Sequence, residues 1–381
     1  MKWTKLSLVA ALAMSSAYAG GDVAPVEPVP VVEACGAKPG TTIAGKLTGY
    51  YITDDSLPAD DMFGDQAQLA FGATLDVTHA FTDWLTANFS AVGYLNTMNH
   101  DTWGFFEGDK KGAWFQVANL TATFDSTSFV AGRQLMGTPM LQGYDWLLAP
   151  GSFEAYTLTN STIENLTLVG SYVTKWRPNN SGEFGGSLDG DNWTIGAAYD
   201  NKTLSGSVWY YNIDAFQAFA ADYTQFYVDL GYDFGMFKLE GQYVDTSYDA
   251  MEDSTAYGIM ASTSLAGFDL SAAYVNLSDN AAGYVGWNSL YTNQWNTTVA
   301  NQYLGDDIDS FKVAAATTFM GISAELSYAD YDNDSYEFDA IFGYDFTDTI
   351  DAGIVYTNTQ STVWDPNEDV NQLEVYANYK F

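Results

Sequence analysis

The amino-acid sequence predicts an all-β protein, a transmembrane antiparallel β-barrel of about 18 strands with an inward-folded third loop. Three observations lead to this fold class. Segments of about ten residues alternate apolar and polar side chains, which is the pattern of a strand with one apolar face. Short turns alternate with long loops along the chain. Aromatic residues make up 16% of the 381 residues, as expected of a barrel with aromatic belts at the membrane interfaces.

The chain begins with a predicted export signal, residues 1–19. Two lysines and a short apolar run precede the small-residue pattern Ala17-Tyr18-Ala19, and the run is shorter than the roughly 20 residues of a spanning helix. Residues 20–40 contain four prolines, so we expect an extended N-terminal segment in the periplasm. Cys35 in this segment is the single cysteine, so no internal disulfide can form. We predict no role for it. The barrel is expected over residues 41–381.

The strand pattern is clearest near the C-terminus. Segments 222–233, 237–243, 337–345 and 372–381 each place apolar residues on one face and polar residues on the other. The first and last strands are expected to pair and close the barrel, because lipid does not tolerate an open sheet edge. The terminal Phe381 resembles the signal by which the barrel-assembly machinery recognises its substrates, so this machinery is a predicted partner during biogenesis.

The connections separate a membrane barrel from a soluble sandwich. Short turns are predicted at Asp125–Thr127, Ala266–Gly267 and Met320–Gly321, whereas long loops are predicted at 174–191 and 277–309. Short connections at one end and long loops at the other are typical of barrels in the outer membrane of Gram-negative bacteria.

The third long loop is the predicted functional element. Residues Leu135–Pro150 join two strands and hold two glycines and two prolines, a density that interrupts both helices and strands. Long loops in compact domains usually have a function. We therefore predict that this loop folds into the barrel and narrows its pore. The predicted constriction residues are Arg133, Tyr144, Asp145, Trp146 and Glu154.

Two interpretations of Arg133 remain open at this point. In one, it faces Asp145 or Glu154 across the pore, so that a transverse field orients dipolar solutes. In the other, it forms an ion pair that fixes the loop to the wall. For Tyr144 and Trp146 we favour packing within the loop over contact with a solute.

The third-loop region resembles that of OprD-like porins and the related major outer-membrane porins of epsilon-class proteobacteria. The resemblance covers about thirty-five residues. The matching stretches are Ala131-Gly132-Arg133-Gln134, Thr138-Pro139, Asp145-Trp146, Pro150, Ser152-Phe153-Glu154, Leu158-Thr159-Asn160 and Gly170-Ser171-Tyr172-Val173. The resemblance implies an eighteen-stranded, trimeric porin whose third loop constricts a channel for small hydrophilic solutes. It also implies that the barrel contacts outer-membrane lipid and lipopolysaccharide.

The charge of the chain departs from that family. Relatives that take up carboxylates carry a ladder of basic residues along the pore, but this chain has 48 acidic and 13 basic residues, and only two arginines. Its net charge of −35 argues against nucleic acid as a partner. Acidic pore walls concentrate cations, so we predict a preference for cations. The predicted lumen residues are Asp229, Asp233, Glu240, Glu325, Asp339, Asp345 and Glu374.

Two other classes of protein are alternatives to a porin: a structural or adhesive surface barrel, and a barrel enzyme. An outward third loop would favour the adhesive barrel. A serine nucleophile usually needs a histidine base. His79 lies at a predicted short periplasmic turn, and His100 lies in a predicted long external loop with no Gly-x-Ser-x-Gly motif nearby. The many aspartates leave an acidic-dyad protease on the barrel rim open, but no pair is singled out. No cofactor and no metal site are predicted. The acidic first loop, with Asp54, Asp55, Asp60 and Asp61, lacks the EF-hand spacing, so solvated charge is favoured over calcium binding.

Overall fold

The structure is a computed structural model that describes residues 39–56, 62–64, 67–98, 111–144, 146–179, 186–187, 190–214, 222–302, 307–361 and 365–381. The predicted export signal and nearly all of the Pro-rich segment lie outside the described residues. Within them, no helix has the length and apolar character needed to cross a membrane.

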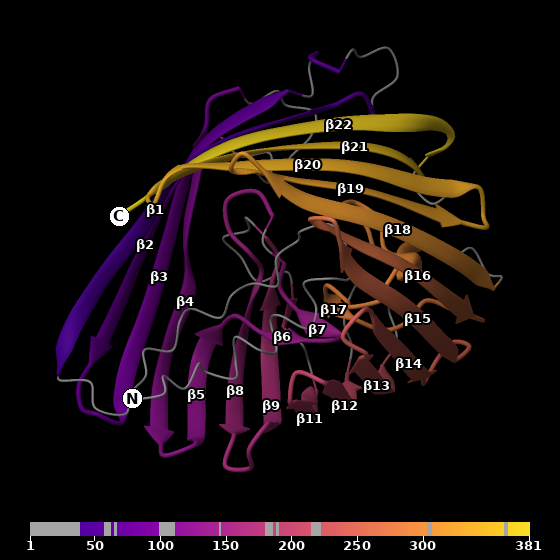
Figure 1. The fold of residues 1–381 in the computed structure, drawn as a ribbon. Coiled ribbons are helices and arrows are strands. Elements are labelled where there is room, and N and C mark those ends of the chain that lie inside the picture. Colours follow the sequence, from indigo (N-terminus) through magenta and orange to yellow (C-terminus); the bar gives the residue numbers. More distant parts are fainter. Residues whose placement is uncertain are drawn as a thin grey trace.

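Eighteen antiparallel strands form the wall of a closed barrel, as the sequence predicts. β1 (Gly40–Asp54) pairs with β22 (Asp365–Lys380) and closes the ring, which Figure 1 shows as indigo beside yellow. The other wall strands are β2 (Gln68–Ala80), β3 (Leu85–Asn96), β4 (Lys111–Phe124), β5 (Thr127–Gln134), β8 (Ser152–Asn160), β9 (Leu166–Arg177), β11 (Trp193–Asp200), β12 (Leu204–Ile213), β13 (Tyr223–Asp233), β14 (Lys238–Tyr248), β15 (Ser254–Leu265), β16 (Phe268–Ser278), β18 (Ile308–Phe319), β19 (Ile322–Tyr331), β20 (Ser335–Thr347) and β21 (Ile350–Ser361). The two-residue β10 (Gly186–Ser187) extends the sheet beside β9.

The alternation of residues decides which side chains face outward. On β13, Phe226 and Leu230 are exposed on the outer face, while Gln225 and Tyr227 are buried on the inner face. Outward aromatic residues gather at both ends of the wall and flank an aliphatic band, as in barrels that sit in a bilayer. Those nearer the loops include Phe71, Phe115, Tyr172, Phe226, Tyr257 and Phe311, and those nearer the turns include Trp84, Phe124, Phe237, Phe319, Phe346 and Tyr379.

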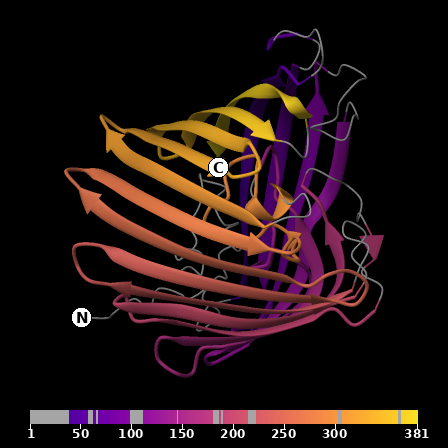
Figure 2. The same cartoon turned by 90° about the vertical axis from the view of Figure 1, so that its right-hand side faces the viewer.

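One end of the barrel has tight turns, which Figure 2 shows at the ends of the strands in the second half of the chain. In Ala266-Gly267 and Met320-Gly321 both residues have positive φ, the conformation of a type I′ hairpin turn. The predicted short turns are therefore confirmed, and their backbone twist matches that of the flanking strands. We call this the turn end and the opposite end the loop end.

Two long loops build a second layer inside the barrel. The third loop contributes β6 (Gly137–Thr138) and β7 (Leu141–Gln142), and the loop between β16 and β18 contributes β17 (Val285–Gly286) and the 3₁₀ helix η1 (Val299–Gln302). The three short strands form one small sheet, which lies within the ring of wall strands in Figure 1. We call the described parts of these two loops the loop layer.

Candidate functional site

Apolar side chains hold the third loop against the inner wall. Met136, Met140 and Leu141 are buried in one cluster with Phe153 of β8. The amide of Met140 donates a hydrogen bond of 3.3 Å to the hydroxyl of Tyr211 on β12. The inward third loop predicted from the sequence is thus confirmed, and buried methionine and leucine side chains provide the contact.

The second long loop binds to the third one through its backbone. The amide of Val285 donates to the carbonyl of Met140 over 3.0 Å, and that of Trp287 donates to the carbonyl of Gln142 over 2.9 Å. The two loops come from hairpins far apart in the chain, so each restricts the movement of the other. The sequence predicts a long loop at residues 277–309, but no role was predicted for it.

Glu374 on β22 fastens both loops to the wall. Its carboxylate accepts hydrogen bonds from Nε1 of Trp146 in the third loop at 3.2 Å and from Nε1 of Trp295 in the second loop at 2.8 Å. Tyr50 and Gln372 also donate to it. The residue is fully buried. Burying a carboxylate is costly unless it is hydrogen-bonded, and here four donors converge on it.

Two further buried carboxylates, on β20, hold the tip of the second loop. Glu337 accepts from the amide of Asn296 at 2.7 Å, and Asp339 accepts from the amide of Trp295 at 3.1 Å. Beside them the ammonium of Lys312 donates to the carbonyl of Asn293 at 2.7 Å. The loop backbone is therefore held by ionisable side chains that point inward from β18 and β20.

Arg177, at the end of β9, holds the C-terminal end of the third loop. Its guanidinium donates to the carbonyl of Pro150 at 2.7 Å and to Oγ of Ser152 at 3.0 Å. It also lies over the ring of Trp114, 5.3 Å from the ring centre. The side chain is fully buried. Sequence reasoning did not assign it a role, although an arginine in so acidic a chain was a usable signal.

Tyr144 and Trp146 pack within the loop layer. Their ring centres are 6.4 Å apart, and the ring of Tyr144 lies 5.0 Å from that of Trp287 in the second loop. Burial raises the pKa of the Tyr144 hydroxyl to about 12. These contacts agree with the packing role favoured for both residues. Asp145, predicted beside them, lies outside the described residues.

The prediction that Arg133 and Glu154 face the pore is wrong. Phe153 and Ala155, on either side of Glu154, are buried against the loop layer, so Glu154 points to the outer face of the wall. Arg133 is its register partner on β5 and lies on the same outer face as the exposed Phe129.

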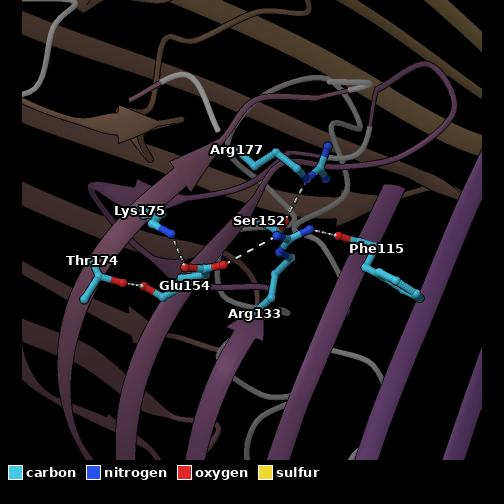
Figure 3. A network of polar contacts seen from close by, with 7 residues as sticks. All are labelled: Phe115, Arg133, Ser152, Glu154, Thr174, Lys175 and Arg177. Atoms are coloured by element: carbon cyan, nitrogen blue, oxygen red, sulfur yellow. Dashed lines mark hydrogen bonds and ion pairs between the residues drawn. The ribbon is translucent and has the colours of Figure 1, made fainter. Parts of the chain in front are cut away.

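On the outer face these residues form a charged group. Arg133 lies 3.4 Å from one oxygen of Glu154, and the ammonium of Lys175 lies 3.0 Å from the other (Figure 3). Arg133 also donates to the carbonyl of Phe115 on β4. The ion pair therefore links neighbouring strands from outside, which is closer to the structural interpretation than to a field across the pore.

The predicted lumen residues all lie on the inner face, but in three surroundings. Asp339 and Glu374 are fully buried beneath the loop layer and bind it. Asp229, Glu240 and Glu325 lie on the wall toward the turn end, and Glu240 pairs with Lys238 at 2.7 Å. Asp233 and Asp345 are exposed at the turn end itself. A role of these seven residues in ion selectivity stays a prediction.

The first loop offers no metal site within the described residues, where no group of three His, Cys, Asp or Glu is placed to hold an ion. Asp54 accepts from the amide and hydroxyl of Ser56, and Asp55 accepts from Asn371 on β22. Asp60 and Asp61 lie outside the described part of the chain.

No protein-family model and no curated protein matches the chain. Solved structures do match. OccK8 (OprE) of Pseudomonas aeruginosa has a TM-score of 0.74 at 16% identity, over 90% of this chain and 98% of that one. OpdK of P. aeruginosa, solved with vanillate, has a TM-score of 0.75 at 14% identity, over 90% and 98% of the two chains. OccAB1 of Acinetobacter baumannii has a TM-score of 0.73 at 15% identity, over 90% and 96%. The chain therefore has the fold of the OprD/Occ porins of the bacterial outer membrane.

Proposed function

We propose that the protein is an OprD-like outer-membrane porin, a passive channel for small hydrophilic solutes and ions that prefers cations. One observation carries the proposal. Two long loops from distant hairpins are fastened inside a lipid-facing barrel by the same buried carboxylate, Glu374. Such a layer narrows the interior and sets the largest solute that passes.

The cation preference is supported by the positions of the two arginines. Arg133 lies on the outer face and Arg177 is buried beneath the third loop, so neither offers a positive charge to the pore. Asp229, Glu240 and Glu325 stay on the inner wall. Acidic walls attract cations and repel anions, whereas carboxylate uptake needs basic ones.

The rival classes find less support. The third loop packs inward, whereas an adhesive barrel would present it to the exterior. His79 bonds to Thr41 through Nδ1 at 2.8 Å on the outer face near the turn end, and His100 lies outside the described residues. Relation to the porins of epsilon-class proteobacteria, trimer formation and contact with lipopolysaccharide are part of the proposal and rest on the resemblance of the third-loop region.

The reversal potential of the refolded protein in a planar bilayer under a KCl gradient tests the proposal. Stable open steps with a cation-selective potential are expected. An anion-selective potential would be consistent with a porin but would refute the proposed preference for cations. A folded barrel without conductance would contradict the channel itself.

A further inference from the structure

Arg133, Glu154 and Lys175 form a group on the outer face of β5, β8 and β9, which we call the outer charged group. The carboxylate of Glu154 lies between the two cations, 3.4 Å from Arg133 and 3.0 Å from the ammonium of Lys175 (Figure 3). Two positive charges and one negative charge leave the group with a net positive charge. It therefore stands out on a chain whose net charge is −35.

A β-bulge at Thr174 turns Lys175 to the outer face. Ala155 pairs with Val173 and Glu154 pairs with Lys175, so Thr174 is an extra residue in β9. Val173 is fully buried on the inner face, and simple alternation would place Lys175 on that face too. Bulges re-aim side chains, often next to functional sites. The local backbone thus places the second cation beside the carboxylate, outside the barrel.

The outer charged group lies at the loop-end aromatic belt. The guanidinium of Arg133 donates to the carbonyl of Phe115, and Tyr172 precedes Lys175 by three residues on β9. Phe115 and Tyr172 both belong to this belt, which marks the depth where lipid tails meet headgroups. In outer-membrane barrels the long loops face the cell exterior. The group therefore lies at the headgroup depth of the outer leaflet.

An exposed apolar surface borders the group on the side of the turn end. Tyr156 and Tyr172 are opposite each other on β8 and β9 and are 53% and 39% exposed. Leu158 and Leu168 continue this face toward the turn end, at 50% and 43%. The wall thus offers a charged group and then an apolar face, in the order in which a membrane lipid presents its headgroup and its tails.

Other parts of the same belt carry carboxylates. Tyr274 on the outer face of β16 donates to Asp309 of β18 at 2.6 Å, and Tyr172 donates to Asp191 at 3.3 Å. Carboxylates repel an anionic headgroup, whereas the outer charged group attracts one. Asp191 therefore limits the positive region on the side of β11.

We propose that the outer charged group binds a phosphate of an outer-leaflet lipid. Arginine and lysine bind phosphate through charge-assisted hydrogen bonds. The Lys175 side chain is 43% exposed, so its ammonium can reach a headgroup, while Glu154 holds both cations in place. A free phosphate ion has the same chemistry, but the apolar surface below the group favours a lipid. The site rests on the proposed function, because only a barrel in the outer membrane meets such a lipid.

The test is native mass spectrometry of the refolded protein in detergent, titrated with lipid A that carries two phosphates. A one-to-one adduct is expected, and its mass identifies the ligand. Lipid A without its phosphates should bind about tenfold more weakly, because it lacks the charged acceptor. Inorganic phosphate should not displace lipid A, because it makes no contact with the apolar surface.

Substitutions within the group give opposite results. Lys175→Gln and Arg133→Gln should each raise the dissociation constant of lipid A about tenfold, because each removes a charged donor. Lys175→Arg keeps the cation and should retain tight binding. Glu154→Gln should lower the dissociation constant, because it removes the carboxylate that competes with the phosphate. An ion pair that only joins strands would show no such gain.

A matched control is Lys202→Asn, which removes a cation from a turn at the opposite end of the barrel. Asparagine tolerates the observed φ of 73° at this position. The variant should bind lipid A as tightly as the unchanged protein. Thermal unfolding in detergent without lipid shows whether each variant is folded.

Two results would overturn the site: unchanged lipid A binding in Lys175→Gln, or equal binding of lipid A with and without phosphates. Displacement by inorganic phosphate would show a site for the free ion instead. Oligomers of the chain that Lys175→Gln abolishes, with lipid A binding unaffected, would assign this face to a second copy. A barrel that binds lipid A but never conducts in planar bilayers would contradict the proposed function and leave the site standing.

Discussion

Nε1 of Trp146 lies 3.2 Å from the carboxylate of Glu374, although 228 residues separate the two in the sequence. This contact joins the third loop to the last strand of the barrel. Trp295 donates to the same carboxylate at 2.8 Å, so one side chain fixes the positions of both loops. The width of the proposed constriction therefore depends on a residue of the wall.

Glu374→Ala should release both loops while the barrel still closes. It removes the acceptor of two indole donors, and an unsatisfied buried donor costs roughly 1–3 kcal/mol. We expect a larger mean conductance with more frequent fluctuations, measured in planar bilayers. Glu374→Gln keeps one acceptor oxygen, so its mean conductance should lie between those of the unchanged protein and Glu374→Ala. A quiet channel of unchanged conductance in Glu374→Ala would show that apolar packing alone holds the loops.

Arg177→Met should loosen the C-terminal end of the third loop. The substitution keeps an apolar stem against Trp114 but leaves the carbonyl of Pro150 without its donor. We expect faster proteolysis between residues 135 and 151 in the folded barrel. Arg177→Lys should recover part of the protection, because one donor remains. Equal cleavage rates in all three proteins would contradict the role assigned to Arg177.

Arg133→Ala and Glu154→Gln should leave ion selectivity and conductance unchanged, because both side chains lie on the outer face. Their ion pair is partly exposed, at 18% for Arg133 and 30% for Glu154, so a loss of about 0–1 kcal/mol of stability is expected. Reversal potentials measure the first effect and thermal unfolding in detergent the second. A shifted reversal potential in Arg133→Ala would place this side chain back at the pore.

Tyr144 should remain protonated to about pH 12, whereas a tyrosine in the unfolded chain ionises near pH 10. Because the pKa is raised in the folded state, the stability linked to it is fully present below pH 10 and is lost as the pH rises toward 12. Tyr144→Phe should therefore make unfolding less dependent on pH between 10 and 12, measured by tryptophan fluorescence. Identical pH profiles would refute the link.

Much of the fold could be predicted because its signals are local. Alternation on β13 identifies both faces of the strand, and residues such as Ala266-Gly267 form a tight turn by themselves. The error at Arg133 and Glu154 was also local. Arg133 shares its strand face with Phe129, and this apolar face was available as a sign that the arginine points outward.

The amino-acid sequence by itself determined the barrel, since period-two alternation, turn residues and the need to leave no open edge act between neighbouring residues and strands. The tertiary structure alone decided the interior. Glu374 was predicted to line an open lumen, yet folding brings Trp146 and Trp295 over it and makes it a buried anchor. The reason is physical. Which distant loop supplies the donors for a buried carboxylate depends on how the closed wall orients its loops, and no local pattern encodes that.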